Sequence, residues 1–327
     1  MVRDIKMADI FEASNLIYDI ARKTPLYKSN DLSKRYNTDI YYKLEFLQDT
    51  RSFKVRGATN FAKHLSEEKL KNGLTTYSTG NHGRATAHVA KKLNTDAKIC
   101  VSKNVPENKI RGIKSSGGQP VIYGNSQDEA QKKANDLSNT ENRAVVPPFD
   151  NKHIICGQGT IGLEIIEKIP KLDSIIVPLS GGGLISGIAF VIKSLNPDCK
   201  VYGISMENGA AMYESIKAGK PVQIDESDSL ADSLQGGILL DNQYTFEMVK
   251  KYVDEIVLVS EEEIEKAMFY TYEQEHFVLE GASVVGTAAI LNDKIDYLGE
   301  KSVIITTGSN VDNNLFFNIV ESKRGER

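Results

Sequence analysis

Short runs of apolar and β-branched residues recur along the chain and alternate with stretches whose apolar residues have the spacing of an amphipathic helix. Turn-forming residues bound each short run, as is typical of strands. We predict strands at 39–46, 74–78, 97–101, 120–123, 144–147, 174–179, 200–205, 255–259 and 302–307. Helical spacing covers 78–92, 106–115, 126–137, 161–168, 184–194 and 260–275. This alternation predicts an α/β fold with mainly parallel strands and right-handed crossovers.

The length of 327 residues favours two domains, because single cores rarely grow beyond about 250 to 300 residues. No internal repeat, low-complexity tract or long Pro/Gly linker separates two halves of the sequence. We therefore expect the chain to cross between the domains through short, compact connections.

Composition excludes several classes of protein. Apolar residues make up 40% and charged residues 26%, as in ordinary globular proteins. The net charge of -4, with both signs interspersed, predicts no nucleic-acid partner. No run approaches the roughly 20 apolar residues that a bilayer span needs, and the amphipathic N-terminus differs from a signal peptide. We expect a cytoplasmic protein that does not bind membranes.

Cysteine and histidine offer no obvious metal site. The three cysteines, Cys100, Cys156 and Cys199, are scattered and lack CxxC spacing, which favours buried free thiols over disulfides or thiolate ligands. The five histidines include no pair at helical ligand spacing. We predict that no metal ion takes part in catalysis.

A glycine-rich loop follows the apolar run 174–179. In the segment 180–187, Ser-Gly-Gly-Gly-Leu-Ile-Ser-Gly, the glycines allow a phosphate to approach the backbone, and the following helix presents its amides and the positive end of its dipole. A tight strand-to-helix turn is the alternative interpretation. Three consecutive glycines exceed what a turn requires, so we favour anion binding.

A second glycine pattern, Gly157-Gln158-Gly159-Thr160-Ile161-Gly162, matches the GxGxxG spacing of dinucleotide-binding turns. The match is weak, because only Ile154 and Ile155 precede it as a possible strand and no acidic residue follows at the expected distance. We interpret 157–162 as the start of a helix, and an NAD-binding protein stays a minor alternative.

Lys54 lies between an aromatic residue and small residues in Ser-Phe-Lys-Val-Arg-Gly-Ala, just after the predicted strand 39–46. A lysine in an apolar pocket loses its charge easily and becomes the neutral amine that imine formation requires. Most lysines are solvated surface residues, which is the simpler interpretation of Lys54 taken alone.

Two further polar segments follow predicted strands. Ser-Thr-Gly-Asn-His-Gly at 78–83 opens a helix, and it could bind a carboxylate or merely cap that helix. Thr-Gly-Ser-Asn at 307–310 ends the last predicted strand, where Ser309 could donate a hydrogen bond to a ligand ring.

Taken together and in chain order, the motifs at 52–58, 78–83, 180–187 and 307–310 resemble the fold-type II pyridoxal-phosphate enzymes, which have the tryptophan synthase β-like fold. The nearest group is the threonine/serine dehydratases and serine racemases. The resemblance extends over nearly the whole chain, from Arg22-Lys23-Thr24-Pro25-Leu26 to Glu280-Gly281-Ala282-Ser283. It implies a large cofactor-binding domain from 1–70 and 145–327, and a small mobile domain at 73–142 that can close over the substrate.

The resemblance also implies site residues. Lys54 would carry pyridoxal 5'-phosphate as a Schiff base, with Phe53 packed beside the cofactor. The phosphate would be held by the amides of Gly181, Gly182, Gly183 and Leu184. Asn81 would bond the ring hydroxyl, and Ser309 would face the pyridine nitrogen. The substrate carboxylate would be held by Ser78, Thr79, Gly80, Asn81 and His82.

The reaction implied by the resemblance is elimination of water and then ammonia from L-threonine, L-serine or a similar β-hydroxy amino acid, with Lys54 removing the α-proton. Thr79 occupies the position of the second proton donor in serine racemases, so racemisation stays an alternative. The segment 205–211 lacks the carboxylate spacing of the racemase cation site.

Two more functions agree with the sequence. The segments 78–84 and 236–246 are similar to the dehydratases of hydroxyectoine breakdown, and a non-catalytic protein could use Lys54 only structurally. We expect an amino acid as the small-molecule partner, and a homodimer or a higher homo-oligomer.

Overall fold

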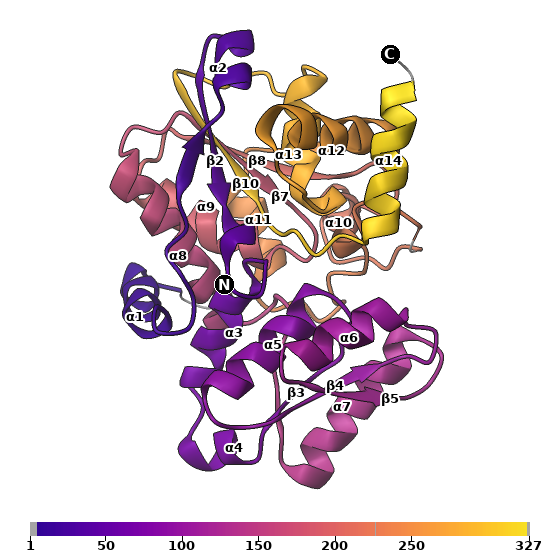
Figure 1. Cartoon of the computed structure of the whole chain (residues 1–327). Coiled ribbons are helices and arrows are strands. Elements are labelled where there is room, and N and C mark those ends of the chain that lie inside the picture. The colour runs from indigo at the N-terminus through magenta and orange to yellow at the C-terminus, as the bar shows by residue number, and fades with distance from the viewer. Residues whose placement is uncertain (1–4, 226, 326–327) are drawn as a thin grey trace.

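A computed structural model describes residues 5–225 and 227–325, so residues 1–4, 226, 326 and 327 of the predicted large domain lie outside the described residues. Figure 1 shows two regions, each built on its own sheet, with helix α3 near the junction. The helices are α1 Met7–Ile17, α2 Asn30–Tyr36, α3 Lys54–Lys63, α4 Glu67–Lys71, α5 Asn81–Lys92, α6 Glu107–Ser115, α7 Gln127–Glu141, α8 Lys152–Lys168, α9 Gly183–Leu195, α10 Ala211–Ala218, α11 Thr245–Tyr252, α12 Glu261–Glu275, α13 Gly281–Leu291 and α14 Asn313–Gly325, with 3₁₀ turns η1 Glu45–Leu47 and η2 Asp232–Leu234.

The larger sheet has six strands in the order β1-β2-β10-β7-β8-β9. Only the edge strand β1 runs antiparallel to its neighbour. The strands are β1 Leu26–Lys28, β2 Asp39–Leu44, β7 Ser174–Pro178, β8 Lys200–Met206, β9 Glu255–Val259 and β10 Lys301–Thr306.

Helices cover both faces of this sheet. Ile176 and Ile304 pack with α12, α13 and α14 on one face, whereas Ile175 and Val303 pack with α8, α9 and α11 on the other. Successive side chains of a strand point to opposite faces, so a strand covered on both faces needs apolar residues at nearly every position. This requirement explains the continuous apolar runs in the sequence.

The smaller sheet has four parallel strands in the order β5-β4-β3-β6. They are β3 Leu74–Thr76, β4 Ala97–Val101, β5 Gln119–Ile122 and β6 Ala144–Val145. One face packs against α3 and α5, and α7 covers the other through Ala130, Ala134 and Leu137. The predicted α/β class with two mainly parallel sheets is confirmed. The strand β6 belongs to this sheet although it lies just beyond the predicted range 73–142, and that domain boundary stays a prediction.

The strand order determines which loops meet. The strands β2, β10 and β7 are adjacent and parallel, so their carboxyl ends lie at one edge of the sheet. The three segments that follow them contain Lys54, Ser309 and the glycines 181–183. Ligand sites of open α/β sheets form outside the carboxyl ends of the strands.

All nine predicted strands are present, but several helices were missed, among them α3, α11, α13 and α14. The helix α3 begins at Lys54 itself, without a side-chain cap, so no capping residue announces it. The interpretation of 157–162 as a helix start is wrong. This segment lies inside α8, which begins at Lys152 after the N-cap Asn151, whose side chain accepts hydrogen bonds from the amides of residues 153 and 154.

The glycines inside α8 allow neighbouring helices to approach closely. A Cβ atom on Gly157 would lie 2.7 Å from the carbonyl oxygen of Arg56 and 2.7 Å from Cα of Gly57, both in α3. On the other side, a Cβ atom on Gly187 of α9 would lie 2.6 Å from the amide nitrogen of Gly159. The GxGxxG pattern therefore serves helix packing in this structure.

We expect Gly157→Ala to lower the free energy of unfolding by about 1 to 3 kcal/mol, because the added methyl group overpacks against backbone that cannot rotate away. Glycine-to-alanine changes inside an open helix normally stabilise by roughly 0.5 to 1 kcal/mol. Gly325→Ala is the control and should change the free energy little, because no atom of the described residues beyond its chain neighbours lies within 4 Å of the position of a Cβ there. Urea unfolding tests this, and equal effects of the two changes would contradict the packing role.

Candidate active site

Lys54 is the first residue of α3, and its side chain is half-buried. Its Nζ atom donates a hydrogen bond to the carbonyl oxygen of Pro148 at 3.0 Å and lies 5.3 Å from the centre of the Phe53 ring. Burial disfavours the charged form and lowers the pKa of Lys54 to about 8. A substantial fraction of the amine is therefore neutral near physiological pH, as nucleophilic attack on an aldehyde requires.

The glycine-rich loop lies between β7 and α9. Gly182 has φ of 86°, a left-handed conformation that favours glycine, and it forms the N-cap of α9. A Cβ atom on Gly181 would lie 2.5 Å from the Phe149 ring, and one on Gly183 would lie 2.9 Å from Cα of Phe149. The first amides of an α-helix have no partner within the helix, and they carry the positive end of its dipole. This loop therefore has the geometry of a phosphate site.

The segment Pro148–Asp150 connects the lysine to the glycine loop. Pro148 accepts the hydrogen bond from Lys54, and Phe149 fills the space beside Gly181 and Gly183. The Asp150 carboxylate accepts hydrogen bonds from three successive amides, those of residues 243, 244 and 245, at 2.6, 2.9 and 2.9 Å. Because Thr245 packs against Gly182, this carboxylate also supports the outer side of the loop.

The segment 78–82 follows β3 and leads into α5. The Asn81 side chain donates to the Glu280 carboxylate at 2.8 and 3.1 Å and accepts from the Asn310 amide at 2.7 Å. No atom lies within 4 Å of the position of a Cβ on Gly80, so the backbone there is accessible. Ser78 and Thr79 are half-buried beside it.

The side chain of His82 contacts the segment that follows β6. Its buried Nε2 atom lies 2.9 Å from the carbonyl oxygen of Val146. Burial, together with the nearby Lys54 amine, lowers the pKa of His82 to about 3, so the ring is neutral and donates to Val146. His82 would therefore reach a substrate carboxylate only through its backbone amide.

Ser309 lies next to the start of α3. Its amide donates to the carbonyl oxygen of Arg51 at 3.0 Å, and the amide of Phe53 donates to Thr307 at 3.1 Å. A bridge between Ser52 and Gly308 completes this contact. The structure thus brings all four sequence motifs together, and their individual roles stay predictions.

Several residues beside these motifs were not predicted as site residues. Glu280 is buried, and this burial raises the pKa of its carboxyl. The hydrogen bonds from Asn310 and Asn81 lower the pKa, but their effect is smaller. A cavity of about 400 Å³ lies next to it, lined by Lys109, Asp232, Asn310 and others, but not by Lys54. The sequence marked the segment 148–150 only as a turn, through the Pro-Pro dipeptide at 147–148 and Asp150.

The described part of the chain contains no group of three or more His, Cys, Asp or Glu side chains placed to hold a metal ion. The three cysteines are buried free thiols, as predicted. Across residues 5–225 and 227–325, no helix combines the length and the apolar character that crossing a bilayer requires.

Comparison with known proteins identifies the family. The model of the family described as pyridoxal-phosphate dependent enzyme matches residues 17–308. The chain belongs to this family. Its residues fit the cofactor that the family name implies, because a desolvated amine and a glycine-lined helix start lie on either side of Pro148–Asp150.

Relatives within the pyridoxal-phosphate dependent family match nearly the whole chain. A putative threonine dehydratase of Sinorhizobium fredii is 43% identical, covering 97% of this chain and 96% of the relative. The L-threonine ammonia-lyase of Thermotoga maritima is 41% identical, covering 97% and 78%. The structure of maize serine racemase has a TM-score of 0.91 at 30% identity, covering 98% of both chains. The predicted fold type, the cofactor and the enzyme class are confirmed at the level of this family.

Proposed function

We propose that this enzyme is a threonine/serine ammonia-lyase, which removes water and then ammonia from a small β-hydroxy amino acid and releases a 2-keto acid. The observation that carries the proposal is similarity over 97% of the chain to relatives named as threonine dehydratase and L-threonine ammonia-lyase. The half-buried Lys54 with a lowered pKa provides the base that such an elimination needs.

Pyridoxal phosphate, when bound, supplies the electron sink for negative charge at the α-carbon. In our proposal the amides of Gly181, Gly182, Gly183 and Leu184 hold its phosphate, Asn81 bonds its ring hydroxyl, and Phe53 packs beside it. Ser309 would face the ring nitrogen and, unlike a carboxylate, would not favour its protonation. The bound cofactor would then store negative charge less deeply, which would favour rapid loss of the β-hydroxyl.

The substrate would be held by its carboxylate at the accessible backbone and hydroxyls of 78–82. The neutral amine of Lys54 would take the α-proton, the Cβ–O bond would break, and the oxygen would leave as water with the proton that Lys54 removed. Released aminoacrylate or its methyl derivative then hydrolyses to the keto acid and ammonia.

Racemisation is the second candidate, and the similarity to maize serine racemase favours it. Thr79 carries a hydroxyl that could protonate the opposite face of the substrate, but its methyl group restricts the side-chain rotamers. We therefore place elimination first. Dehydration of a hydroxyectoine-derived substrate would use the same residues with a different substrate side chain.

Incubation of the purified enzyme with L-threonine and L-serine is expected to give keto acid and ammonia in equal amounts, with the D-isomer as a minor product. Coupled keto-acid assays and chiral chromatography measure the three products. Predominant D-isomer would instead assign the enzyme as a racemase. Absence of both products, with turnover of hydroxyectoine-pathway intermediates, would select the third candidate.

We further propose that residues 73–142 move as a small domain that closes over the substrate, since this part of the chain contributes the segment 78–82. We also propose a homodimer or a higher oligomer in the cytoplasm. Light scattering with and without substrate tests the assembly state and the compaction.

A further inference from the structure

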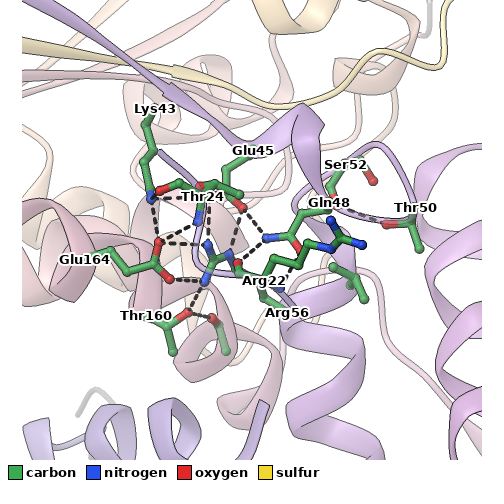
Figure 2. Close-up of polar contacts among 12 residues, drawn as sticks. Arg22, Thr24, Lys43, Glu45, Gln48, Thr50, Ser52, Arg56, Thr160 and Glu164 are labelled. Atoms are coloured by element: carbon green, nitrogen blue, oxygen red, sulfur yellow. Dashed lines mark hydrogen bonds and ion pairs between the residues drawn. The ribbon is translucent and has the colours of Figure 1, made fainter. Parts of the chain in front are cut away.

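Four charged side chains form a cluster in the interior next to α3, made of Lys43, Glu45, Arg56 and Glu164. Figure 2 shows Arg56 between the two carboxylates. Its guanidinium donates to Glu45 at 2.7 and 2.9 Å and to Glu164 at 2.6 and 3.0 Å. The Lys43 amine bonds to Glu164 at 2.5 Å. The exposed fractions are 0% for Arg56 and Glu45, 1% for Lys43 and 6% for Glu164.

Neutral groups complete the hydrogen bonding of this cluster. Thr160 accepts from Arg56 at 3.0 Å, Tyr18 donates to Glu164 at 2.7 Å, and the carbonyl of Thr24 accepts from Lys43 at 2.6 Å. Burial alone would raise the pKa of Glu164, but the adjacent Arg56 guanidinium and Lys43 amine outweigh it and lower the pKa. The formal charges of the two basic and two acidic side chains of the cluster balance.

Stability alone does not account for four buried charges. Removing ions from water costs several kcal/mol each, and apolar replacements of similar size are often as stable or more stable. A buried network in which all five N–H groups of Arg56 are paired has another property, because it favours one arrangement of the segments that contribute to it. The segments fixed here are the end of β2, η1, α3, α8 and residues 18–24.

The position of Arg56 relates this cluster to the reactive amine. Arg56 follows Lys54 by two residues in the first turn of α3, and residues two apart in a helix differ by roughly 200° around its axis. The two carboxylates hold the Arg56 guanidinium on one side of α3. Lys54 therefore projects from the opposite side of the helix. On that side, Lys54 reaches Pro148 beside the glycine loop.

We propose that the cluster of Lys43, Glu45, Arg56 and Glu164 positions Lys54, with Arg56 as the central positioning residue. The inference rests on the proposed function, in which Lys54 carries the cofactor. The cluster fixes the rotation and the height of the first turn of α3, and through them the direction in which the lysine amine approaches the cofactor aldehyde.

Arg56→Lys tests the proposal, because it keeps the charge and loses the planar fork that pairs both carboxylates. We expect kcat to fall about 10- to 100-fold, since small displacements of a reacting group have effects of this size. The substrate KM should change much less. Borohydride reduction followed by peptide mass spectrometry should show less cofactor trapped on Lys54, and equilibrium dialysis should show weaker binding of pyridoxal phosphate by the apoprotein.

Arg143→Lys is the matched control, because Arg143 forms ion pairs with Asp96 at 2.8 Å and Glu141 at 2.6 Å. Arg143 and Asp96 precede β6 and β4, so this pair lies at the amino ends of the parallel strands, opposite the segment 78–82. The control variant should lower the melting temperature without changing trapping or kcat. Equal trapping and kcat in Arg56→Lys and wild type would overturn the proposal. If Arg56→Lys fails to fold, Thr160→Val is the second test, because it removes one acceptor of Arg56. It should lower kcat and the amount of cofactor trapped on Lys54 several-fold. No change in either quantity would overturn the proposal. Wild-type protein that is not labelled at Lys54 would contradict the proposed function instead.

Discussion

Replacing Lys54 with methionine is expected to abolish turnover and, at the same time, to make the apoprotein more stable. Turnover should fall about 10⁴-fold, since the variant would lose both roles that we propose for Lys54, the proton transfer and the covalent attachment of the cofactor. Stability should rise because burial disfavours the charged amine, with its pKa lowered from 10.5 to about 8. Each pKa unit corresponds to about 1.4 kcal/mol, so the shift costs about 3.5 kcal/mol; the lost bond to Pro148 offsets about 1 kcal/mol, leaving a net gain of about 2 to 3 kcal/mol at pH 7.

The pH dependence follows from the direction of the shift. Between about pH 8 and pH 10.5 the unfolded chain holds a proton at Lys54 that the folded chain has released. The free energy of unfolding of the wild-type apoprotein therefore rises with pH across this range. The cost of burying the lysine is fully present below pH 8 and disappears as the pH approaches 10.5. Urea unfolding of both apoproteins at pH 7 and pH 10 should therefore show a smaller difference at the higher pH.

Lys63→Met, at the other end of α3, is the control for this result. Lys63 donates to Asp19 at 2.6 Å and to the carbonyl of Leu16 at 2.8 Å, so its removal should lower stability slightly and leave turnover unchanged. An apoprotein destabilised by Lys54→Met would show that Lys54 has a structural role. This was the alternative that the sequence alone could not exclude.

The sequence indicated the components of the site because each motif follows a strand, where a change from apolar to small and polar residues is visible locally. It could not indicate their proximity. Lys54 and Ser309 meet because β10 lies between β2 and β7, and this order depends on how all helices pack on the sheet. The order of the strands in a sheet cannot be predicted from residues that are close together in one sequence.

The cluster of Lys43, Glu45, Arg56 and Glu164 could not be predicted from the sequence for the same reason. Lys43, Glu45 and Arg56 are close in sequence, but Glu164 lies 108 positions after Arg56. Charged residues are mostly solvated, so each one taken alone predicts a surface position. Similarly, the glycines at 157–162 have the spacing of a nucleotide-binding turn, and only the packing of α8 against α3 and α9 shows their use.

Replacing Gly182 with alanine is expected to weaken binding of pyridoxal phosphate about 10- to 100-fold, measured by equilibrium dialysis of the apoprotein. The φ of 86° is costly for alanine, and the new methyl group would lie 2.9 Å from Met212 and 3.0 Å from Thr245. To relieve this contact, the backbone of the loop between β7 and α9 must rotate. The amides at the start of α9 then no longer converge on the position proposed for the phosphate. A displaced anion site loses affinity because its donors act only when they converge.

Gly219→Ala separates this effect from general strain. Gly219 has φ of 71° at the end of α10, and no atom lies within 4 Å of the position of its Cβ. Both changes should lower the free energy of unfolding by about 1 to 2 kcal/mol, the cost of a left-handed backbone for alanine, and the contacts with Met212 and Thr245 should add to this at Gly182. Only Gly182→Ala should weaken cofactor binding. Equal dissociation constants for the two folded variants would show that the phosphate is held elsewhere, and the assignment of residues 181–184 would then be wrong. Weaker binding by folded Gly182→Ala alone would support an anion site at the start of α9.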